Sequence, residues 1–200
     1  MTPAPRVFAG VLLALAGCAG APPVRTFVLS AALDPQTYPV PAQAAPAVQV
    51  QPVLLPDYLD TEEILVRNGL HELQASATGR WGERLSAGIA HSLSAALVLR
   101  LPGYRLEPGR PRDKAARQVI VDVEAFDVWR DGHCALSASW TILERETGAV
   151  VVADRGLFTT PPGSLSASGD DTVVAAMARA VGELAVALSA AVLTPADAFP

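Results

Sequence analysis

Apolar and polar residues alternate along three consecutive segments in the second half of the chain. A period of two with turn residues between the runs predicts an antiparallel meander. The segments and their turns are Gln118–Trp129, Asp131-Gly132, Cys134–Glu144, Thr147-Gly148 and Ala149–Thr159. The middle segment alternates most cleanly, so Leu136 and Trp140 are expected to face the core.

The first strand of this meander changes phase partway along. Val119, Val121 and Val123 share one face, whereas Phe126 and Val128 fall on the other. Either a β-bulge shifts the alternation, or both faces of the strand are partly covered.

Two longer segments have a helical period instead. From Trp81 onwards, a leucine or isoleucine recurs at every fourth position until Pro102-Gly103, which predicts a helix that ends before the proline. A second helix is predicted to begin with Asp170 or Asp171 as its N-cap and to run to about Leu193. The apolar stripe of this second helix is Val173, Met177, Val181, Leu184, Leu188 and Val192.

A β-hairpin is predicted in the first half of the chain. Glu62–Arg67 and His71–Ala75 flank Asn68-Gly69, and both turn residues tolerate positive φ. Extended segments are also expected at Thr26–Ala31 and Val48–Leu55.

Two segments without a period are predicted to be loops. The stretch 34–47 is rich in Pro and Ala, and the stretch 108–117 is basic. The order of elements predicts an α+β fold in one domain, in which two main helices pack against a mixed or antiparallel β-sheet.

The amino terminus has the pattern of a secretion signal. Arg6 precedes an apolar run, Val7–Ala16, that is too short to span a bilayer as a helix. The run ends in Leu15-Ala16-Gly17-Cys18, which resembles the bacterial lipobox. We therefore expect residues 1–17 to be a lipoprotein signal peptide and the Cys18 thiol to be lipidated. The alternative is an ordinary signal peptide with an incidental cysteine.

The predicted lipidation defines the remaining domain boundaries. Residues 18–25 form a short tether, 26–193 the single auxiliary domain and 194–200 a C-terminal tail. Acyl chains such as palmitate would hold the protein at a membrane, because each buried CH₂ contributes about 0.8 kcal/mol. Ala19 follows the cysteine where an Asp usually retains such proteins at the inner membrane, so the periplasmic face of the outer membrane is expected.

Net charge and cysteine content argue against a nucleic-acid partner and an internal disulfide. With Arg6 removed from the 15 basic residues, 14 remain against 20 acidic ones, a formal balance of −6 that makes nucleic acid an unsuitable partner. Cys134 is the only cysteine besides Cys18, so the mature chain forms no internal disulfide. Its place on an apolar strand favours a buried, inert thiol over a reactive one.

No catalytic motif is apparent in the sequence. GxSxG, Walker-type and HExxH patterns are absent, and His133 and Cys134 are strand neighbours that point to opposite faces. Asp122 and Glu124 share a polar strand face, which favours solvation over acid–base catalysis. His91 lies opposite the apolar helix stripe and is expected in solvent. We expect no enzyme activity, no cofactor and no metal.

Three segments, together with the lipobox, carry a resemblance to a known family. They are Leu55–Asp60, Ile64–Arg67 and Arg80–Leu85. In this order they resemble the PqiC-like family of ABC-type transport auxiliary lipoproteins. The family often has a basic residue after the Leu-Asp pair, where this chain has the uncharged Thr61.

The resemblance implies a non-enzymatic, membrane-tethered subunit of an MCE-type system that moves lipid between the two membranes. Its partner would be a periplasmic MCE-type subunit, which the lipoprotein docks or receives. The alternatives are a lipid-binding carrier with an apolar cavity and an assembly lipoprotein for an outer-membrane protein.

Two surfaces are candidates for partner contact. Arg80 and Trp81 are residue types enriched at binding hot spots, although Trp81 is the better candidate for a packing anchor on the sheet. Ala178, Gly182 and Ala185 form a row of small residues on the last helix, which favours either a homo-oligomer or partner contact, or close packing within one subunit.

Overall fold

Two β-sheets and two helices make up the part of the chain that the computed structural model describes, residues 23–29, 41–42, 44–108, 117–163 and 169–195. The helices are α1 (Leu85–Arg100) and α2 (Asp170–Leu193). The strands are β1 (Arg25–Phe27), β2 (Ala47–Val50), β3 (Glu63–Arg67), β4 (Leu73–Trp81), β5 (Arg105–Pro108), β6 (Arg117–Val128), β7 (Cys134–Glu144) and β8 (Val150–Thr160). This arrangement confirms the predicted α+β class.

The larger sheet has the strand order β5-β2-β6-β7-β8. Strands β6, β7 and β8 form the predicted antiparallel meander, whereas β2 pairs in parallel with both β5 and β6. Gly132 and Gly148 adopt positive φ in the two turns. The β6–β7 register shifts between Val123 and Ala125, so a bulge accounts for the change of phase in β6.

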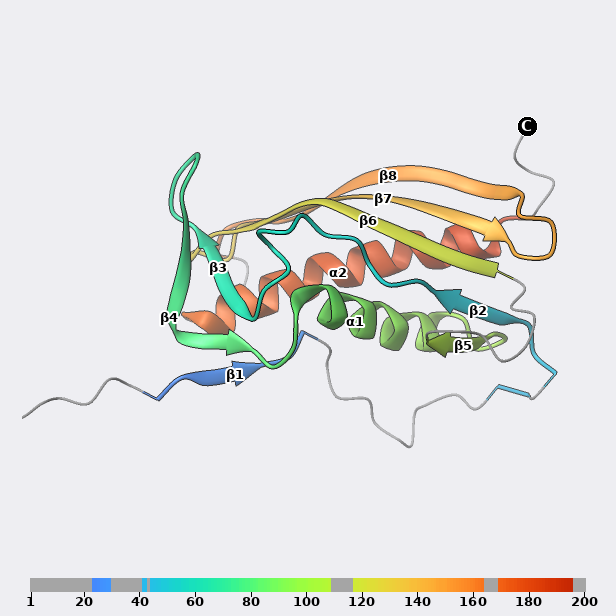
Figure 1. The fold of residues 1–200 in the computed structure, drawn as a ribbon, viewed down its shortest axis with the longest axis horizontal. Helices are drawn as coiled ribbons and strands as arrows, with labels where there is room; N and C mark the ends of the chain where they lie inside the picture. Colours follow the sequence, from blue (N-terminus) through green and yellow to red (C-terminus); the bar gives the residue numbers. More distant parts are fainter. Residues whose placement is uncertain (1–22, 30–40, 43, 109–116, 164–168, 196–200) are drawn as a thin grey trace, which may run out of the picture.

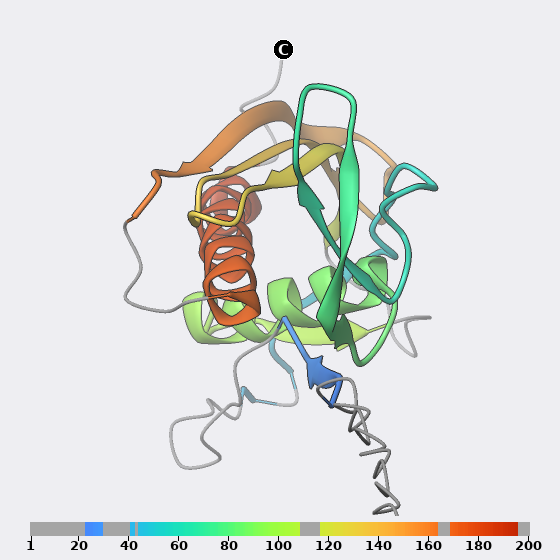
Figure 2. The same cartoon turned by 90° about the vertical axis from the view of Figure 1, so that its left-hand side faces the viewer.

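The core lies between this sheet and α2, which runs along one face of the sheet (Figure 1). Leu136 and Trp140 are 0% and 6% exposed, which confirms that this face of β7 is buried. α1 packs beside α2 under the same sheet (Figure 2). The predicted apolar stripe of α2 is buried in full.

The start of α2 differs from the prediction. Gly169, with φ of 61°, occupies the N-cap position and no side chain caps the helix, so neither Asp170 nor Asp171 is the N-cap. By length and composition α2 could cross a membrane, since an 18-residue stretch of it has a mean hydropathy of 1.6. Its contacts with α1, β7 and β8 identify it as the core helix of the domain.

The first helix begins later than predicted. Trp81 is the last residue of β4, and α1 starts at Leu85 after a short turn. Its first turn is capped from elsewhere in the chain, because the Ser86 backbone N–H donates to Asp60 Oδ1 at 3.0 Å. The predicted end is confirmed, since α1 stops at Arg100 before Pro102-Gly103.

The predicted hairpin is present as β3 and β4, but its turn differs. The Asn68 N–H donates to the Glu72 carbonyl at 3.0 Å, so the loop is longer than two residues. Neither Asn68 nor Gly69 adopts positive φ. The expected turn type is therefore wrong, although the hairpin itself is confirmed.

Three short strands could not be placed correctly from the sequence. β1 is shorter than the predicted Thr26–Ala31, whose last two residues lie outside the described part. Ala47, predicted to end a loop, belongs to β2. β5 was not predicted at all, and it exists because it pairs in parallel with β2.

Candidate functional site

The attachment of β1 is the feature of the fold nearest to the predicted lipidation site. Cys18 itself lies outside the described residues. β1 adds to the edge of β4 in a parallel register that sets Arg25 opposite Gly79 and Thr26 opposite Arg80. The Gly82 N–H continues this pairing by donating to the Phe27 carbonyl at 2.7 Å.

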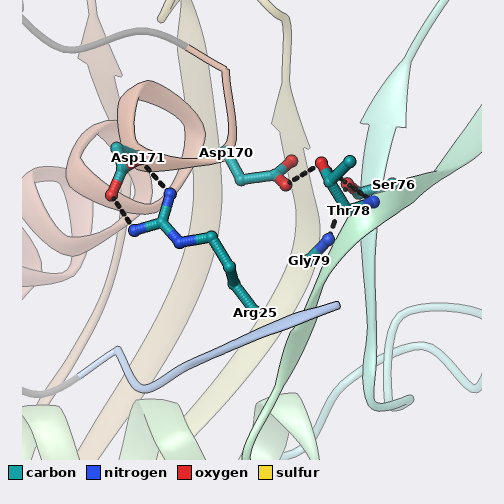
Figure 3. A network of polar contacts seen from close by, with 6 residues as sticks. All are labelled: Arg25, Ser76, Thr78, Gly79, Asp170 and Asp171. Carbon is teal, nitrogen blue, oxygen red and sulfur yellow. Dashed lines mark hydrogen bonds and ion pairs between the residues drawn. The ribbon is translucent and has the colours of Figure 1, made fainter. Parts of the chain in front are cut away.

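An ion pair fixes β1 to the start of α2. The Arg25 guanidinium donates two hydrogen bonds to the Asp171 carboxylate, at 2.6 and 2.9 Å (Figure 3). This hydrogen bonding lowers the pKa of Asp171 and raises the pKa of Arg25. The guanidinium also lies over the Phe27 ring, 4.7 Å from its centroid. Both partners are exposed to solvent, so the ion pair adds little to the stability of the whole fold. Its main effect is to hold β1 in position.

A partly buried hydrogen bond continues this contact into β4. Thr78 Oγ1 donates to Asp170 Oδ2 at 2.7 Å, and Asp170 is only 7% exposed (Figure 3). A Cβ on Gly79 would lie 2.6 Å from that same Asp170 oxygen, so only glycine allows the approach. We call Arg25, Thr78, Asp170 and Asp171 the N-terminal clasp.

The structure separates Arg80 from Trp81. Trp81 is 3% exposed and packs in the core, as the packing-anchor alternative expected. Arg80 is exposed on the opposite face of β4, and no ion pair or hydrogen bond of its side chain is found among the described residues. Of the two, only Arg80 is available for contact with a partner.

The small residues of α2 do not form a single exposed row. Ala185 is fully buried, and so are the neighbouring Ala176 and Ala180, because the helix is wedged between the sheet and α1. Gly182 differs, since a Cβ at this position would meet no atom within 4 Å. The exposed stripe of α2 passes beside it and consists of Arg179, Glu183, Val186, Ala190 and Leu193.

Cys134 and the pair Asp122 and Glu124 were considered as catalytic groups, and their surroundings do not favour catalysis. Cys134 is fully buried, and burial, with the nearby Asp127 and Glu183 charges, raises its pKa to about 12. Asp122 and Glu124 are exposed, and Glu124 accepts a hydrogen bond from Ser137. No cluster of three or more metal-ligating side chains occurs within the described ranges.

A groove of about 280 Å³ separates part of α1 from the segment after β2. The Ser94 hydroxyl in this groove donates to the Ala90 carbonyl, and exposed His91 pairs with Glu83 at 3.0 Å. Serine and histidine are therefore not hydrogen-bonded to each other. The groove is also at the lower limit of small-molecule pockets, which span roughly 300–1,000 Å³.

A second hollow, of about 490 Å³, lies beside the tip of the β3–β4 hairpin. Arg67 lines it and donates to Asp127 Oδ1 at 2.7 Å, and Leu70 at the tip is 87% exposed. An ion pair in the lining is unsuitable for an acyl chain. Neither of these two hollows is an enclosed apolar cavity.

These features define a class: an α+β domain whose first described strand is clasped to the core helix. The chain belongs to the ABC-type transport auxiliary lipoprotein component family, whose model matches residues 27–189. This match confirms the family resemblance seen in the sequence.

Solved structures share the fold. Protein XCC0632 from Xanthomonas campestris, of family DUF330, superposes with a TM-score of 0.59 at 17% identity, covering 84% of this chain and 90% of its own. The crystal structure of an uncharacterized protein gives a TM-score of 0.64 at 18% identity, covering 74% and 92%. No curated protein matches this sequence.

Proposed function

We propose that this protein is a lipid-anchored docking subunit of an MCE-type ABC lipid transport system, held by acylated Cys18 at the periplasmic face of the outer membrane. Family membership supports the role of auxiliary lipoprotein in ABC-type transport. The lipid cargo, the MCE-type partner and the choice of the outer membrane are the further steps of this proposal.

The observation that carries the proposal is the position of β1. Strand β1 begins at Arg25, seven residues after Cys18, so the tether spans about 25 Å at most when fully extended. The N-terminal clasp joins β1 to both β4 and α2, so the whole domain stays near the membrane that holds the acyl chains. Such a domain is placed to receive a periplasmic partner at the membrane surface.

A non-enzymatic docking role accounts for the site better than its rivals do. A lipid carrier needs an enclosed apolar cavity. The groove beside α1 has a volume of only about 280 Å³, and the hollow of about 490 Å³ at the hairpin is lined by the Arg67–Asp127 ion pair. An assembly lipoprotein for an outer-membrane protein would use the same anchor, and it differs in its partner. Binding of a purified MCE-type periplasmic domain to the mature lipoprotein distinguishes these two roles.

The anchor is tested by replacing Cys18. We expect Cys18→Ser to abolish palmitate labelling and to leave a soluble protein or an uncleaved precursor, because lipobox chemistry requires the thiol. Cys134→Ala is the matched control, since it removes the other cysteine and should keep full labelling. Labelling that persists in Cys18→Ser would refute the anchor.

A further inference from the structure

The two faces of β1 differ in what they contact. Arg25 and Phe27 point inward, towards α2 and the core. Because side chains alternate along a strand, Val24, Thr26 and Val28 share the outward face. Val24 and Val28 are 56% and 57% exposed, which leaves two apolar side chains at the ends of this short strand in solvent.

Arg80 adds a positive charge to the same face. It is the register partner of Thr26, and paired residues in neighbouring strands point to the same side of a sheet. The exposed Glu63 is its partner on the other side, in β3, but no ion pair between them is found among the described residues. We call Val24, Thr26, Val28 and Arg80 the β1 patch.

The backbone holds this patch in one orientation. A Cβ on Gly82 would lie 3.2 Å from Thr26 Cγ2 and 3.4 Å from Val28 Cγ1, so the glycine lets β1 lie close against β4. The clasp fixes the inward face of the same strand through Arg25 and Asp171. The β1 patch is therefore a preformed surface of the domain.

Chain length restricts what this patch can meet. Val24 lies six residues after Cys18, so an extended chain places it no more than about 20 Å from the acylated cysteine. Apolar side chains beside an arginine suit the boundary between headgroups and acyl chains, where guanidinium binds phosphate oxygens. An anionic leaflet also attracts an arginine side chain that lies near its surface.

We propose that the β1 patch is the surface with which the domain rests on the phospholipid headgroups of its own membrane. This inference rests on the anchor at Cys18, because acylation is what brings the patch to the bilayer. The contact would fix the orientation of the domain, in addition to its distance from the membrane.

The test uses the mature lipidated protein in vesicles of phosphatidylethanolamine and phosphatidylglycerol, with a quencher attached to the lipid headgroup. Val28→Cys supplies one reactive surface thiol for a fluorophore, because Cys18 is acylated and Cys134 is buried with its pKa raised to about 12. Leu157→Cys is the matched control. Leu157 is 67% exposed on β8, which lies on the opposite side of the domain from β1 in both views (Figure 1; Figure 2).

Vesicle flotation comes first, and quenching is then compared between the two labelled positions. We expect strong quenching at position 28 and little at position 157. Arg80→Glu should reduce quenching at position 28 towards the control value, whereas Arg80→Lys should retain it. Protein that does not float refutes the anchor and the patch together. Flotation with equal quenching at both positions refutes the patch alone.

Discussion

Asp170 and Asp171 lie in the first turn of α2, where negative side chains interact favourably with the helix dipole. The structure gives each of them a partner far away in the sequence. Asp171 binds Arg25 and Asp170 binds Thr78, across 146 and 92 residues respectively. These two acidic residues therefore join the first strand, the hairpin and the core helix, and the space for this junction is left by Gly79.

Gly79→Ala is expected to destabilise the protein by about 1–3 kcal/mol, because the added methyl group overpacks the clasp. It would also lie 2.9 Å from Phe27 Cε2, so movement of Asp170 alone does not relieve the clash. Urea denaturation followed by circular dichroism measures the change. Gly182→Ala is the control, since its Cβ meets open space and helix propensity favours alanine by about 1 kcal/mol. A Gly79→Ala protein as stable as wild type would contradict the tight junction.

At the scale of elements, α1 shows that a helix start can depend on another segment. Its N-cap residue, Arg84, makes no side-chain cap. Asp60 supplies one from the loop before β3, by accepting hydrogen bonds from Ser86 and Arg84. Burial alone would raise the pKa of Asp60, but these hydrogen bonds and the Arg84 charge outweigh burial and lower it.

Asp60→Ala is expected to cost about 1 kcal/mol at neutral pH, as loss of a helix cap does. The folded pKa of Asp60 lies below the unfolded value of 3.8, so its stabilisation is complete above that value and is lost as pH falls through the folded pKa. The stability difference between variant and wild type should therefore shrink below about pH 4. Denaturation midpoints across acidic pH check this, with exposed Arg84→Ala expected to have the smaller effect. A difference independent of pH would contradict the charge contribution.

The whole molecule buries one face of the larger sheet under two helices and exposes its contact surfaces elsewhere. The flank of α2 beside Gly182 has Val186 and Leu193 at 47% and 58% exposure. Exposed apolar side chains on an otherwise buried helix suit contact with a second molecule. This flank is separate from the β1 patch, so one domain could meet the bilayer and a protein partner at the same time.

Gly182→Arg is expected to weaken self-association or MCE-domain binding while leaving a folded monomer, because a bulky charge would replace open space on this flank. Light scattering measures the mass, and circular dichroism the fold. Leu70→Arg introduces the same side chain at the exposed hairpin tip and should change neither. Unchanged mass and binding in Gly182→Arg would reject the α2 flank as an interface.

The sequence alone determined the parts of the fold that depend on local periodicity. Alternation defined β6, β7 and β8 and the buried face with Leu136 and Trp140. The phase change in β6 predicted either a bulge or two partly covered faces, and the structure has the bulge after Val123. The period of α2 gave its buried stripe and its end near Leu193, although its N-cap is Gly169 and not an aspartate. These features follow from neighbours in the chain, because side-chain direction repeats every 2 or 3.6 residues. The three matched segments likewise identified the family.

Only the tertiary structure decided the features that depend on distant partners. β5 is a strand because β2 lies beside it, and Trp81 ends a strand because β1 and β3 pair with β4. Residue type also did not show which small residues of α2 are buried, since Ala185 packs in the core whereas Gly182 faces open space. The partners of Asp170 and Asp171 were equally hidden. Hydrogen bonds and burial depend on which segments meet in space, and that is decided by packing of the whole chain rather than by local sequence.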